Sequence, residues 1–228
     1  MRTQEKRATR FRSIQTSLLF VIVPAVIISM AVLSLMGYLS SKAIIQTSAG
    51  TEMSQCLSVA MGSIEMSLSN NRMVAETMAR GVEAVQRQAV KGEQTASDWD
   101  AAAYQEILTS FVGSNPETFG GGIWFEPYQY RPEQRYFSPY CMRQNGAVTY
   151  VDNYSLGEGV YYTDQDWYTN AANTTQKSVW SAPYYDEFAQ ISMVTSSAPI
   201  YDETGRLLGV ATADIDLTQM QQMVLSLD

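Results

Sequence analysis

Acidic and aromatic side chains gather in two short stretches in the second half of this chain of 228 residues. The stretches are DQDWYTNA (164–171) and WSAPYYDE (180–187), and a further acid, Asp214, stands within GVATADIDL (209–217). Carboxylates make charge-assisted hydrogen bonds with ammonium groups, and an aromatic ring over a cation adds about 0.5–2 kcal/mol. These residue types could therefore bind an ammonium group or another small cation.

Asp214 is the acid whose neighbours say most about its role. It stands in a run with the apolar residues Val210, Ala211 and Ala213, which is typical of a buried strand. An ionised carboxylate in such a place is costly unless it is paired, so we interpret Asp214 as a binding residue. Asp216, two residues later, is expected to begin a helix or to lie at the surface.

The same residues also fit interpretations without a ligand. Trp167 and Tyr168 could be core aromatic residues at the start of a helix, with Asp166 capping that helix or facing solvent. Asp186 and Asp214 could instead be the two carboxyls of a hydrolase, which flank a cleft in glycosidases. The sequence contains no D-x-[DN]-x-[DN]-G calcium loop, and we expect no metal or other cofactor.

The composition excludes several classes of protein. The chain has no histidine, which excludes a Ser-His-Asp triad, an HExxH zinc site and a phosphorylated histidine. The net charge is −8, and the acidic body lacks the clustered Lys and Arg that nucleic-acid binding requires. Cys56 and Cys141 are too few for a disulfide framework, so we expect thiols, although Cys56 could join two copies of the chain.

An uncharged segment near the N-terminus predicts a transmembrane helix. Residues 13–41 carry no charge, and their centre, LLFVIVPAVIISMAVLSLMGYL, is long enough to cross the roughly 30 Å hydrocarbon layer. A cleaved signal peptide is the alternative, but its apolar region would be about 7–15 residues long. Five basic residues lie within residues 1–12, so the positive-inside rule predicts a cytoplasmic N-terminus and an extracytoplasmic body. In a bacterium this would be a single-pass protein of the inner (cell) membrane.

Residues 42–112 are predicted to form a long helix followed by a second helix. Apolar residues recur every three or four positions in the first part, which has no proline. They are Met53, Leu57, Ala60, Ile64, Leu68, Val74, Met78, Val82, Val85 and Ala89. We expect this helix to connect the membrane to the rest of the chain and to pair with a second copy in a homodimer, while its distal half could pack on its own domain. The second helix is expected to begin at a capping box, Ser97 to Asp100.

From residue 113 to residue 228 the pattern changes to alternation with many aromatic residues, which predicts strands. GGIWFEP is one predicted strand, and two predicted hairpins turn at Gln144–Ala147, which contains Asn-Gly, and at Glu203–Arg206. The final stretch, TQMQQMVLSLD, is typical of a helix start. The fold class is therefore α+β, with a long N-terminal helix and an antiparallel sheet of about five strands after one transmembrane helix.

The order of these features resembles a known family. A transmembrane helix and a long helix precede D-W-Y, W-x-x-P-Y-Y-D, S-x-P-I-Y-D-x-x-G and G-V-x-x-x-D-I-x-L. This order resembles the Cache domain, a PAS-like extracytoplasmic sensor of bacterial chemoreceptors and sensor kinases. The resemblance covers residues 42–228 and is to the distal, ligand-binding module of double Cache proteins, in which a smaller proximal module, a second membrane helix and a cytoplasmic output domain follow.

The resemblance also implies which residues contact the ligand. In amino-acid-binding members, an Arg two residues before the Trp of W-Y holds the ligand carboxylate, while a Y-x-D pair and the Asp of D-I-x-L hold the ammonium. Here Gln165 stands at the Arg position, between two acids that would repel a carboxylate. The implied ligand-binding residues are Tyr162 (or its neighbour Tyr161), Gln165, Trp167, Tyr168, Tyr184, Asp186 and Asp214.

Together these features predict extracytoplasmic sensing by the input module of a bacterial transmembrane signalling receptor. The retained ammonium half and the altered carboxylate half of the site favour a small amine or another cationic or polar metabolite. The alternatives are a membrane-anchored, Cache-like interaction or structural protein without a ligand, and an extracytoplasmic enzyme. We expect no catalytic activity and no nucleic-acid partner.

Overall fold

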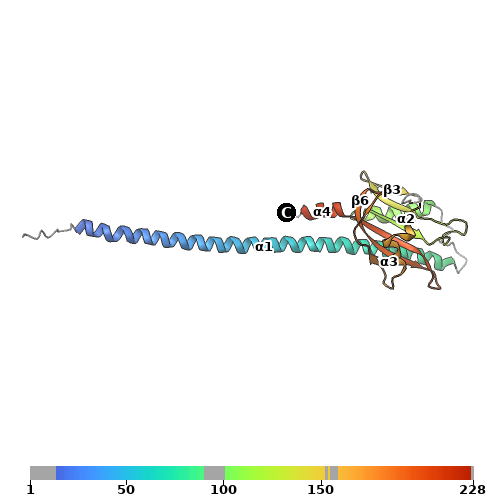
Figure 1. Ribbon diagram of the computed structural model, residues 1–228, viewed down its shortest axis with the longest axis horizontal. Helices are drawn as coiled ribbons and strands as arrows, with labels where there is room; N and C mark the ends of the chain where they lie inside the picture. The colour runs from blue at the N-terminus through green and yellow to red at the C-terminus, as the bar shows by residue number, and fades with distance from the viewer. Residues whose placement is uncertain (1–13, 90–100, 152–153, 155–158, 227–228) are drawn as a thin grey trace, which may run out of the picture. The chain divides into compact units, whose positions relative to one another are not determined.

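The computed structural model describes residues 14–89, 101–151, 154 and 159–226 (Figure 1). The chain divides into two compact units, residues 1–57 and residues 58–228. The predicted basic N-terminus, residues 1–12, and the predicted capping box at Ser97 to Asp100 lie outside the described residues.

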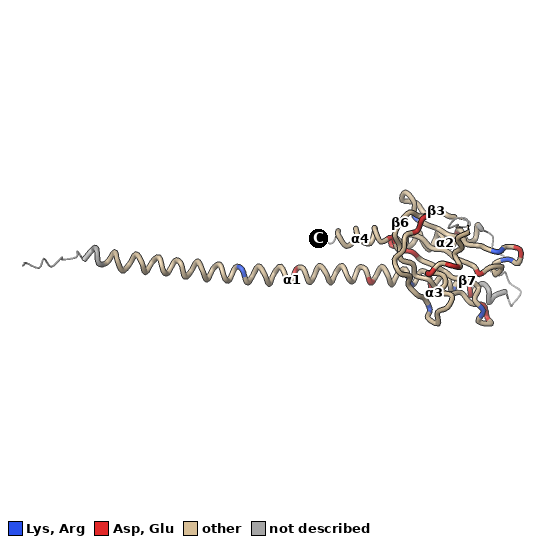
Figure 2. Tube along the Cα trace, viewed as in Figure 1, with Lys and Arg blue, Asp and Glu red and all other residues tan. Residues whose placement is uncertain are grey.

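The first unit contains the N-terminal part of helix α1 (Ile14–Ala89). Residues 14–41 of this helix contain no Asp, Glu, Lys or Arg, and the corresponding stretch of the tube in Figure 2 is uniformly tan. Pro24 lies inside the helix, as membrane helices tolerate. Among the described residues, α1 is the one helix whose length and composition would allow it to cross a membrane.

The second unit is built on one antiparallel sheet of seven strands. Its order is β3-β2-β1-β7-β6-β4, and β5 also pairs with β6. The strands are β1 (Gly120–Phe125), β2 (Tyr140–Gln144), β3 (Ala147–Val151), β4 (Val179–Trp180), β5 (Tyr184–Asp186), β6 (Ile191–Tyr201) and β7 (Leu207–Asp216). The remaining elements are helix α2 (Ala101–Ser114), the 3-10 helix η1 (Tyr162–Asp164), helix α3 (Asp166–Ala172) and helix α4 (Leu217–Leu225).

Each face of the sheet has its own hydrophobic core, because side chains alternate between the two faces along a strand. On one face, Val74 and Met78 of α1 and Leu108 of α2 pack with Ala211 of β7 (Figure 1). The core on the other face is mostly aromatic and includes Val210, the neighbour of Ala211. Its aromatic members are Phe119, Trp124, Tyr140, Tyr154, Tyr162, Trp167 and Tyr168. The aromatic stretches singled out from the sequence therefore share one face of the sheet.

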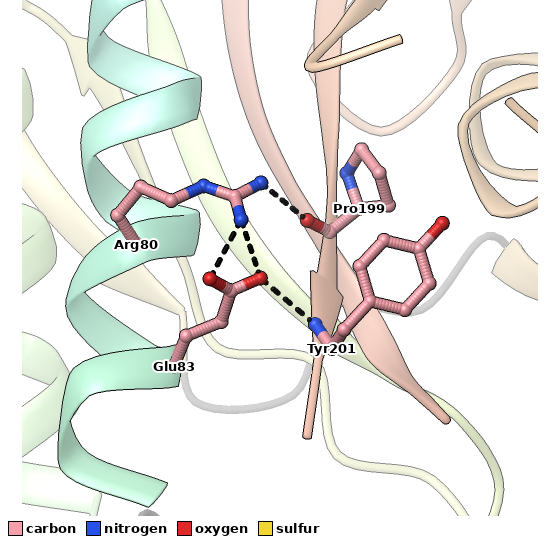
Figure 3. Close-up of polar contacts among 4 residues, drawn as sticks. All are labelled: Arg80, Glu83, Pro199 and Tyr201. Atoms are coloured by element: carbon pink, nitrogen blue, oxygen red, sulfur yellow. Dashed lines mark hydrogen bonds and ion pairs between the residues drawn. The ribbon is translucent and has the colours of Figure 1, made fainter. Parts of the chain in front are cut away.

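Two polar side chains of α1 bind the backbone of β6 (Figure 3). Glu83 accepts the backbone N–H of Tyr201 at 3.0 Å, and both of its carboxylate oxygens accept from Nη1 of Arg80 at 2.7 and 2.6 Å. Nη2 of Arg80 donates to the backbone carbonyl of Pro199 at 3.2 Å. The distal part of α1 is thus joined to the sheet by hydrogen bonds as well as by apolar packing.

Local chemistry explains the turns and the last helix. Asn145 and Gly146, between β2 and β3, have φ values of 50° and 81°, which a two-residue Asn-Gly hairpin turn requires. Gly205, between β6 and β7, has a φ of 81°. Asp216 accepts the backbone N–H of Thr218 at 2.8 Å and caps the N-terminus of α4. Both predicted hairpins and the helix start at Asp216 are confirmed.

The predicted α+β class with a long N-terminal helix and an antiparallel sheet is confirmed, but the sheet has seven strands instead of about five. The difference includes β4 and β5, which have only two and three residues and pair with β6. Strands this short carry no visible alternation in the sequence. The domain boundaries at residues 41 and 112 remain predictions.

Candidate ligand-binding site

A small cavity lies within the aromatic face of the sheet. Its volume is about 10 Å³, roughly the room that one water molecule needs. The residues that line it are Trp124, Tyr140, Tyr154, Trp167, Tyr184, Asp186, Met193, Thr195, Thr212 and Asp214. Five of these described residues are aromatic and two are aspartates, and none of them is Lys or Arg. The cavity is therefore acidic and has aromatic walls.

Asp214 of β7 is one of the two acids, and only 3 % of its surface is exposed. Its Oδ2 accepts a hydrogen bond from the Tyr140 hydroxyl at 2.6 Å, and its Oδ1 accepts one from the Thr195 hydroxyl at 2.7 Å. Thr195 lies directly opposite Asp214 in the β6–β7 ladder, so strand pairing itself brings this hydroxyl to the carboxylate. Both oxygens of Asp214 are hydrogen-bonded by neutral donors.

Asp186, the second acid, stands at the end of β5 and is also buried. Its Oδ1 accepts from the Tyr154 hydroxyl at 2.6 Å and from the backbone N–H of Ala189 at 2.7 Å. No described residue donates a hydrogen bond to its Oδ2. This oxygen can therefore accept from a ligand in the cavity.

The protonation of Asp214 responds to its surroundings. Burial raises the pKa of its carboxyl to about 7, while the hydrogen bonds from Tyr140 and Thr195 lower it and the charge of Asp186 raises it. Burial also raises the pKa of Tyr140 well above its usual value, so this hydroxyl keeps its proton at neutral pH. A cation placed in the cavity would favour the ionised form of Asp214.

When Asp214 is ionised, most side-chain donors around the cavity donate to acceptors of the cavity lining itself. Thr195 donates to Asp214, so the hydroxyl of Tyr184, 2.8 Å from Oγ1 of Thr195, must donate to Thr195. The indole N–H of Trp124 donates to the Thr212 hydroxyl at 2.8 Å. The tyrosines that donate to the two aspartates complete this pattern, and the groups that remain for a ligand are mainly acceptors.

Trp124 forms the centre of the aromatic wall. Its ring centre lies 4.8 Å from that of Trp167, 5.3 Å from that of Tyr154 and 5.7 Å from that of Tyr140, with tilted or edge-on geometry. Rings in such positions present both faces and edges to the enclosed space. The wall is suited to a cation, which an aromatic face attracts.

The structure brings four of the seven predicted site residues to this cavity. They are Trp167, Tyr184, Asp186 and Asp214. They come from α3, from both ends of β5 and from β7, so the chain folds three separate stretches around one space.

Tyr162 and Tyr168 belong to the same aromatic core but do not line the cavity. The hydroxyl of Tyr162 donates to the backbone carbonyl of Phe125 at 2.6 Å. The hydroxyl of Tyr168 donates to Oε1 of Glu126 at 2.7 Å. Both side chains hold α3 and the preceding segment onto the end of β1, so their position is that of support residues.

Gln165 does not line this cavity and instead lines two surface grooves of about 260 and 340 Å³. Its Nε2 donates to the backbone carbonyl of Tyr161 at 3.4 Å. Trp167 and Tyr184 line both grooves as well as the cavity, and Asp186 lines the smaller groove and the cavity. Trp167 and Tyr184 therefore separate the cavity from the larger groove. A molecule in the smaller groove would therefore meet both Gln165 and Asp186, whereas Asp214 lines only the cavity.

Six residues of the cavity were not predicted from the sequence: Trp124, Tyr140, Tyr154, Met193, Thr195 and Thr212. Thr212 carries a signal that could have found it, because it lies two residues before Asp214 on the same face of a strand. Trp124 lies in a predicted strand with alternating pattern. Tyr140 and Tyr154 carry no such signal, because Tyr140 reaches the site through the pairing of β2 with β1, and Tyr154 follows β3, which pairs with β2.

A model of the family described as methyl-accepting chemotaxis protein-like, first PDC sensor domain, matches residues 104–222, more than half of the chain. The chain belongs to this family. The predicted Cache-type sensor is thereby confirmed. A PDC sensor domain has a ligand-binding role and no catalytic one, in agreement with the expectation that this chain is not an enzyme.

Individual relatives of this PDC domain are chemoreceptors. Over 62 residues the chain is 39% identical to the methyl-accepting chemotaxis protein McpC of Bacillus subtilis (strain 168). This match covers 27% of this chain and 9% of McpC. The sensory domain of the Campylobacter jejuni chemoreceptor Tlp3 (CcmL) has the same fold, with a TM-score of 0.53 at 16% identity over 74% of this chain and 60% of that one. The Tlp3 ligand-binding domain in complex with L-valine gives a TM-score of 0.53 at 16% identity, over 75% of this chain and 60% of that one. The chain thus spans less than two thirds of each of these relatives.

Proposed function

We propose that this PDC domain is the extracytoplasmic input module of a bacterial transmembrane signalling receptor, and that its ligand is a small amine or another cationic polar metabolite. Residues 13–41 would cross the inner (cell) membrane once, with residues 1–12 in the cytoplasm and residues 42–228 outside. The membership of a sensor family supports the sensing role. The ligand class rests on the chemistry of the cavity.

One observation carries the choice of an amine: Asp186 and Asp214 line one cavity whose side-chain donors mostly have acceptors within the protein. An ammonium group brings several N–H donors and a positive charge, which match the acceptors and compensate the two carboxylates. Among the described residues of the lining, the Trp167 indole and the Thr212 hydroxyl donate to no acceptor, and both are neutral. A ligand carboxylate would lose its hydration there without gaining a cationic partner, which is strongly unfavourable.

The grooves outside the cavity support the same choice. Gln165 is flanked there by Asp164 and Asp166, and all three line the larger groove. Glu187 lines the smaller groove together with Gln165. An α-amino acid whose ammonium reached the aspartates would leave its carboxylate near these acids, where like charges repel each other. A decarboxylated amine has no such conflict.

A cavity of about 10 Å³ cannot hold an organic amine without movement of its walls. The wall between the cavity and the larger groove consists of Trp167 on α3 and Tyr184 on β5. We infer that the ligand enters from the grooves, displaces these side chains outward and merges the cavity with the groove space. The cost of that opening is offset by the ion pairs that form with Asp186 and Asp214.

Strand β6 offers a path from the ligand to α1. Thr195 on β6 is hydrogen-bonded to Asp214, and Pro199 and Tyr201 on the same strand are hydrogen-bonded to Arg80 and Glu83 (Figure 3). A ligand that draws Asp214 toward itself would act on Thr195 and so on β6. We propose that α1 receives this shift and carries it toward the membrane.

We also propose that the chain acts as a homodimer through α1. Met53 and Leu57, four residues apart on this helix, are 77% and 62% exposed, so an apolar stripe is open to a second copy. Oxidation of the full chain in membranes is expected to give a cross-linked dimer through Cys56, which lies between them, and Cys56→Ser should abolish it. A chain that stays monomeric in this assay and in light scattering would contradict the dimer.

The ligand class can be tested by thermal unfolding of the full chain in detergent micelles. L-valine, the ligand named for the Tlp3 domain, is compared with isobutylamine, which is valine without its carboxylate. Isobutylamine in excess is expected to raise Tm because it binds the folded state, whereas L-valine should leave Tm unchanged. Asp214→Asn should remove the response to isobutylamine.

Two outcomes would contradict the proposal in different ways. A rise in Tm with L-valine but not with isobutylamine would overturn the amine assignment and keep the sensor. No response of the chain to any amine, amino acid or organic acid in a broad screen would favour the alternative, a PDC domain with a structural or interaction role.

A further inference from the structure

Tyr140 reaches Asp214 by an unusual route across a whole strand. It stands on β2 opposite Gly122 of β1, while Asp214 stands on β7 opposite Gly120 of β1. Neighbouring strands are about 4.8 Å apart, so the two residues belong to strands about 9.6 Å apart. The Tyr140 ring must therefore lie over β1 for its hydroxyl to come within 2.6 Å of Oδ2 of Asp214.

The residues beneath the ring are glycines, and any side chain would block it. A Cβ on Gly120 would overlap the Tyr140 hydroxyl oxygen and lie 2.7 Å from its Cζ. A Cβ on Gly122 would lie 2.9 Å from Cδ2 of the same ring and 3.1 Å from Cε2 of Trp124. Two positions of β1 on the ligand face thus have to be glycine for Tyr140 to lie where it does.

Asp214 is surrounded by groups from several elements. Tyr140 of β2 and Thr195 of β6 donate to it, while Asp186 of β5 is the nearby acid that disfavours its charge. Tyr154 and Tyr184 also line the cavity and keep their protons at neutral pH because burial raises the pKa of each. Among these groups, the Tyr140 hydroxyl is the larger of the two hydrogen-bonding influences that favour ionised Asp214.

We propose that Gly120 and Gly122 are positioning residues of the ligand site, which hold Tyr140 across β1 so that its hydroxyl donates to Asp214 and favours the ionised form that accepts a cation. The inference rests on the proposed function, because it assigns Asp214 to the ligand. It adds that the strength of cation binding depends on two glycines of β1 that do not themselves line the cavity.

The test is an infrared titration of the full chain in detergent without ligand. The carbonyl band of a protonated carboxylic acid is followed between pH 5 and pH 9, and the part that Asp214→Asn removes is assigned to Asp214. Tyr140→Phe is expected to move the midpoint of this band upward by about one pH unit, because a hydrogen bond to the charged form is lost. Gly120→Ala, which displaces the ring, should move it in the same direction.

Gly121→Ala is the matched control. Gly121 lies between the two positioning glycines but faces α1, and its Cβ would lie 2.9 Å from the backbone oxygen of Thr212 and 3.3 Å from Cε of Met78. This variant should lower Tm through crowding and leave the Asp214 midpoint unchanged. A midpoint that Tyr140→Phe does not move, or that Gly121→Ala moves equally, would overturn the inference, as would the absence of an Asp214 band in both the natural chain and Tyr140→Phe.

A second pair of variants covers the case in which Gly120→Ala does not fold. Combined with Tyr140→Leu, Gly120→Ala should recover cooperative unfolding, because the ring atoms that the methyl group overlaps are gone. If the double variant unfolds no more cooperatively than Gly120→Ala alone, the role of the glycine is refuted.

The infrared result does not depend on any ligand, so it can fail or succeed separately from the proposed function. If isobutylamine binds, its affinity should fall as the pH is lowered, with the same midpoint as the infrared band of Asp214. In Tyr140→Phe this fall in affinity should begin at higher pH. The affinity at pH 7 should therefore be lower than in the natural chain by a factor of up to about ten. A purely structural role of Tyr140 would lower the affinity equally at every pH.

Discussion

Glu83 of α1 accepts the backbone N–H of Tyr201 of β6 at 3.0 Å (Figure 3). On this side of β6, strand β4 pairs with Ser196 and Ser197 and strand β5 with residues 191–193, so among the described residues no strand pairs with β6 at Tyr201. The Glu83 carboxylate and the Arg80 guanidinium, which donates to the Pro199 carbonyl, take the place of a neighbouring strand there. The helix and the sheet therefore share hydrogen bonds that an apolar contact alone could not provide.

Loss of the Glu83 carboxylate is expected to destabilise the fold. Glu83→Ala leaves the part-buried backbone N–H of Tyr201 without its acceptor and Arg80 without its carboxylate partner, which we expect to cost about 1–3 kcal/mol in the free energy of unfolding. Glu83→Gln keeps an acceptor for Tyr201 and should cost less. Chemical unfolding of the two variants checks this order, and equal stability of Glu83→Ala and the natural chain would contradict it.

The stability of the domain should fall with rising pH because of Asp214. The pKa of Asp214 is about 7 in the folded protein, whereas the ordinary pKa of an aspartate is 3.8. Between pH 3.8 and pH 7 the folded state therefore retains a proton that the unfolded state has lost. Asp214 therefore contributes most to the free energy of unfolding below about pH 4. This contribution, on the order of 4 kcal/mol, is lost as the pH rises through about 7.

Asp214→Asn removes this titration and should flatten the dependence. Other carboxyls titrate mainly below pH 5, so the comparison is made between pH 5.5 and pH 8, where Tm of the natural chain is expected to decrease and Tm of the variant to stay level. Parallel curves for the two proteins would show that Asp214 titrates outside this range.

Trp167 and Tyr168 should differ sharply despite being neighbours. Trp167 lines the cavity, so Trp167→Leu should weaken binding of isobutylamine by roughly tenfold, the effect of one lost cation–π contact. Tyr168→Phe loses the hydrogen bond to Glu126 and should lower Tm with little change in affinity. Calorimetric titration at matched temperature measures both affinities, and an equal loss in both variants would contradict the assignment of Trp167 to the wall.

A change of Gln165 should alter which ligand the chain accepts. Gln165→Arg places a cation in the grooves, where it can bind the carboxylate of an amino acid whose ammonium reaches the aspartates. L-valine is then expected to raise Tm, and the response to isobutylamine should decrease. Gln165→Met is the control of similar size without charge, and a valine response in that variant would point to shape instead of charge.

The fold was largely predictable because its signals are local. Asn145-Gly146 specifies a hairpin, Asp216 caps a helix, and the stripe through Val74 and Met78 marks the face of α1 that packs on the sheet. Strands β4 and β5 were missed because two or three residues show no period, and their strand character comes from pairing with β6.

The site was predictable only on one side. The motifs around Trp167, Asp186 and Asp214 mark stretches that meet at the cavity, because each combines acids and aromatic residues in a pattern of its own. Tyr140 and Tyr154, the donors to the two aspartates, stand in stretches without such a pattern. The role of Tyr140 depends on the strand order, which places β2 beside β1, and on Gly120 and Gly122, which have no Cβ to block its ring.

The division of the domain into two cores has a consequence for how such sensors can diversify. The core on the α1 and α2 face contains mostly aliphatic residues, while the cavity lies on the other, mostly aromatic face. Substitutions at Gln165 or Trp167 leave the α1 face and its hydrogen bonds to β6 untouched. Related domains could therefore acquire a different ligand through substitutions on the aromatic face. The contacts between α1 and β6, which we propose transmit ligand binding, would stay unchanged.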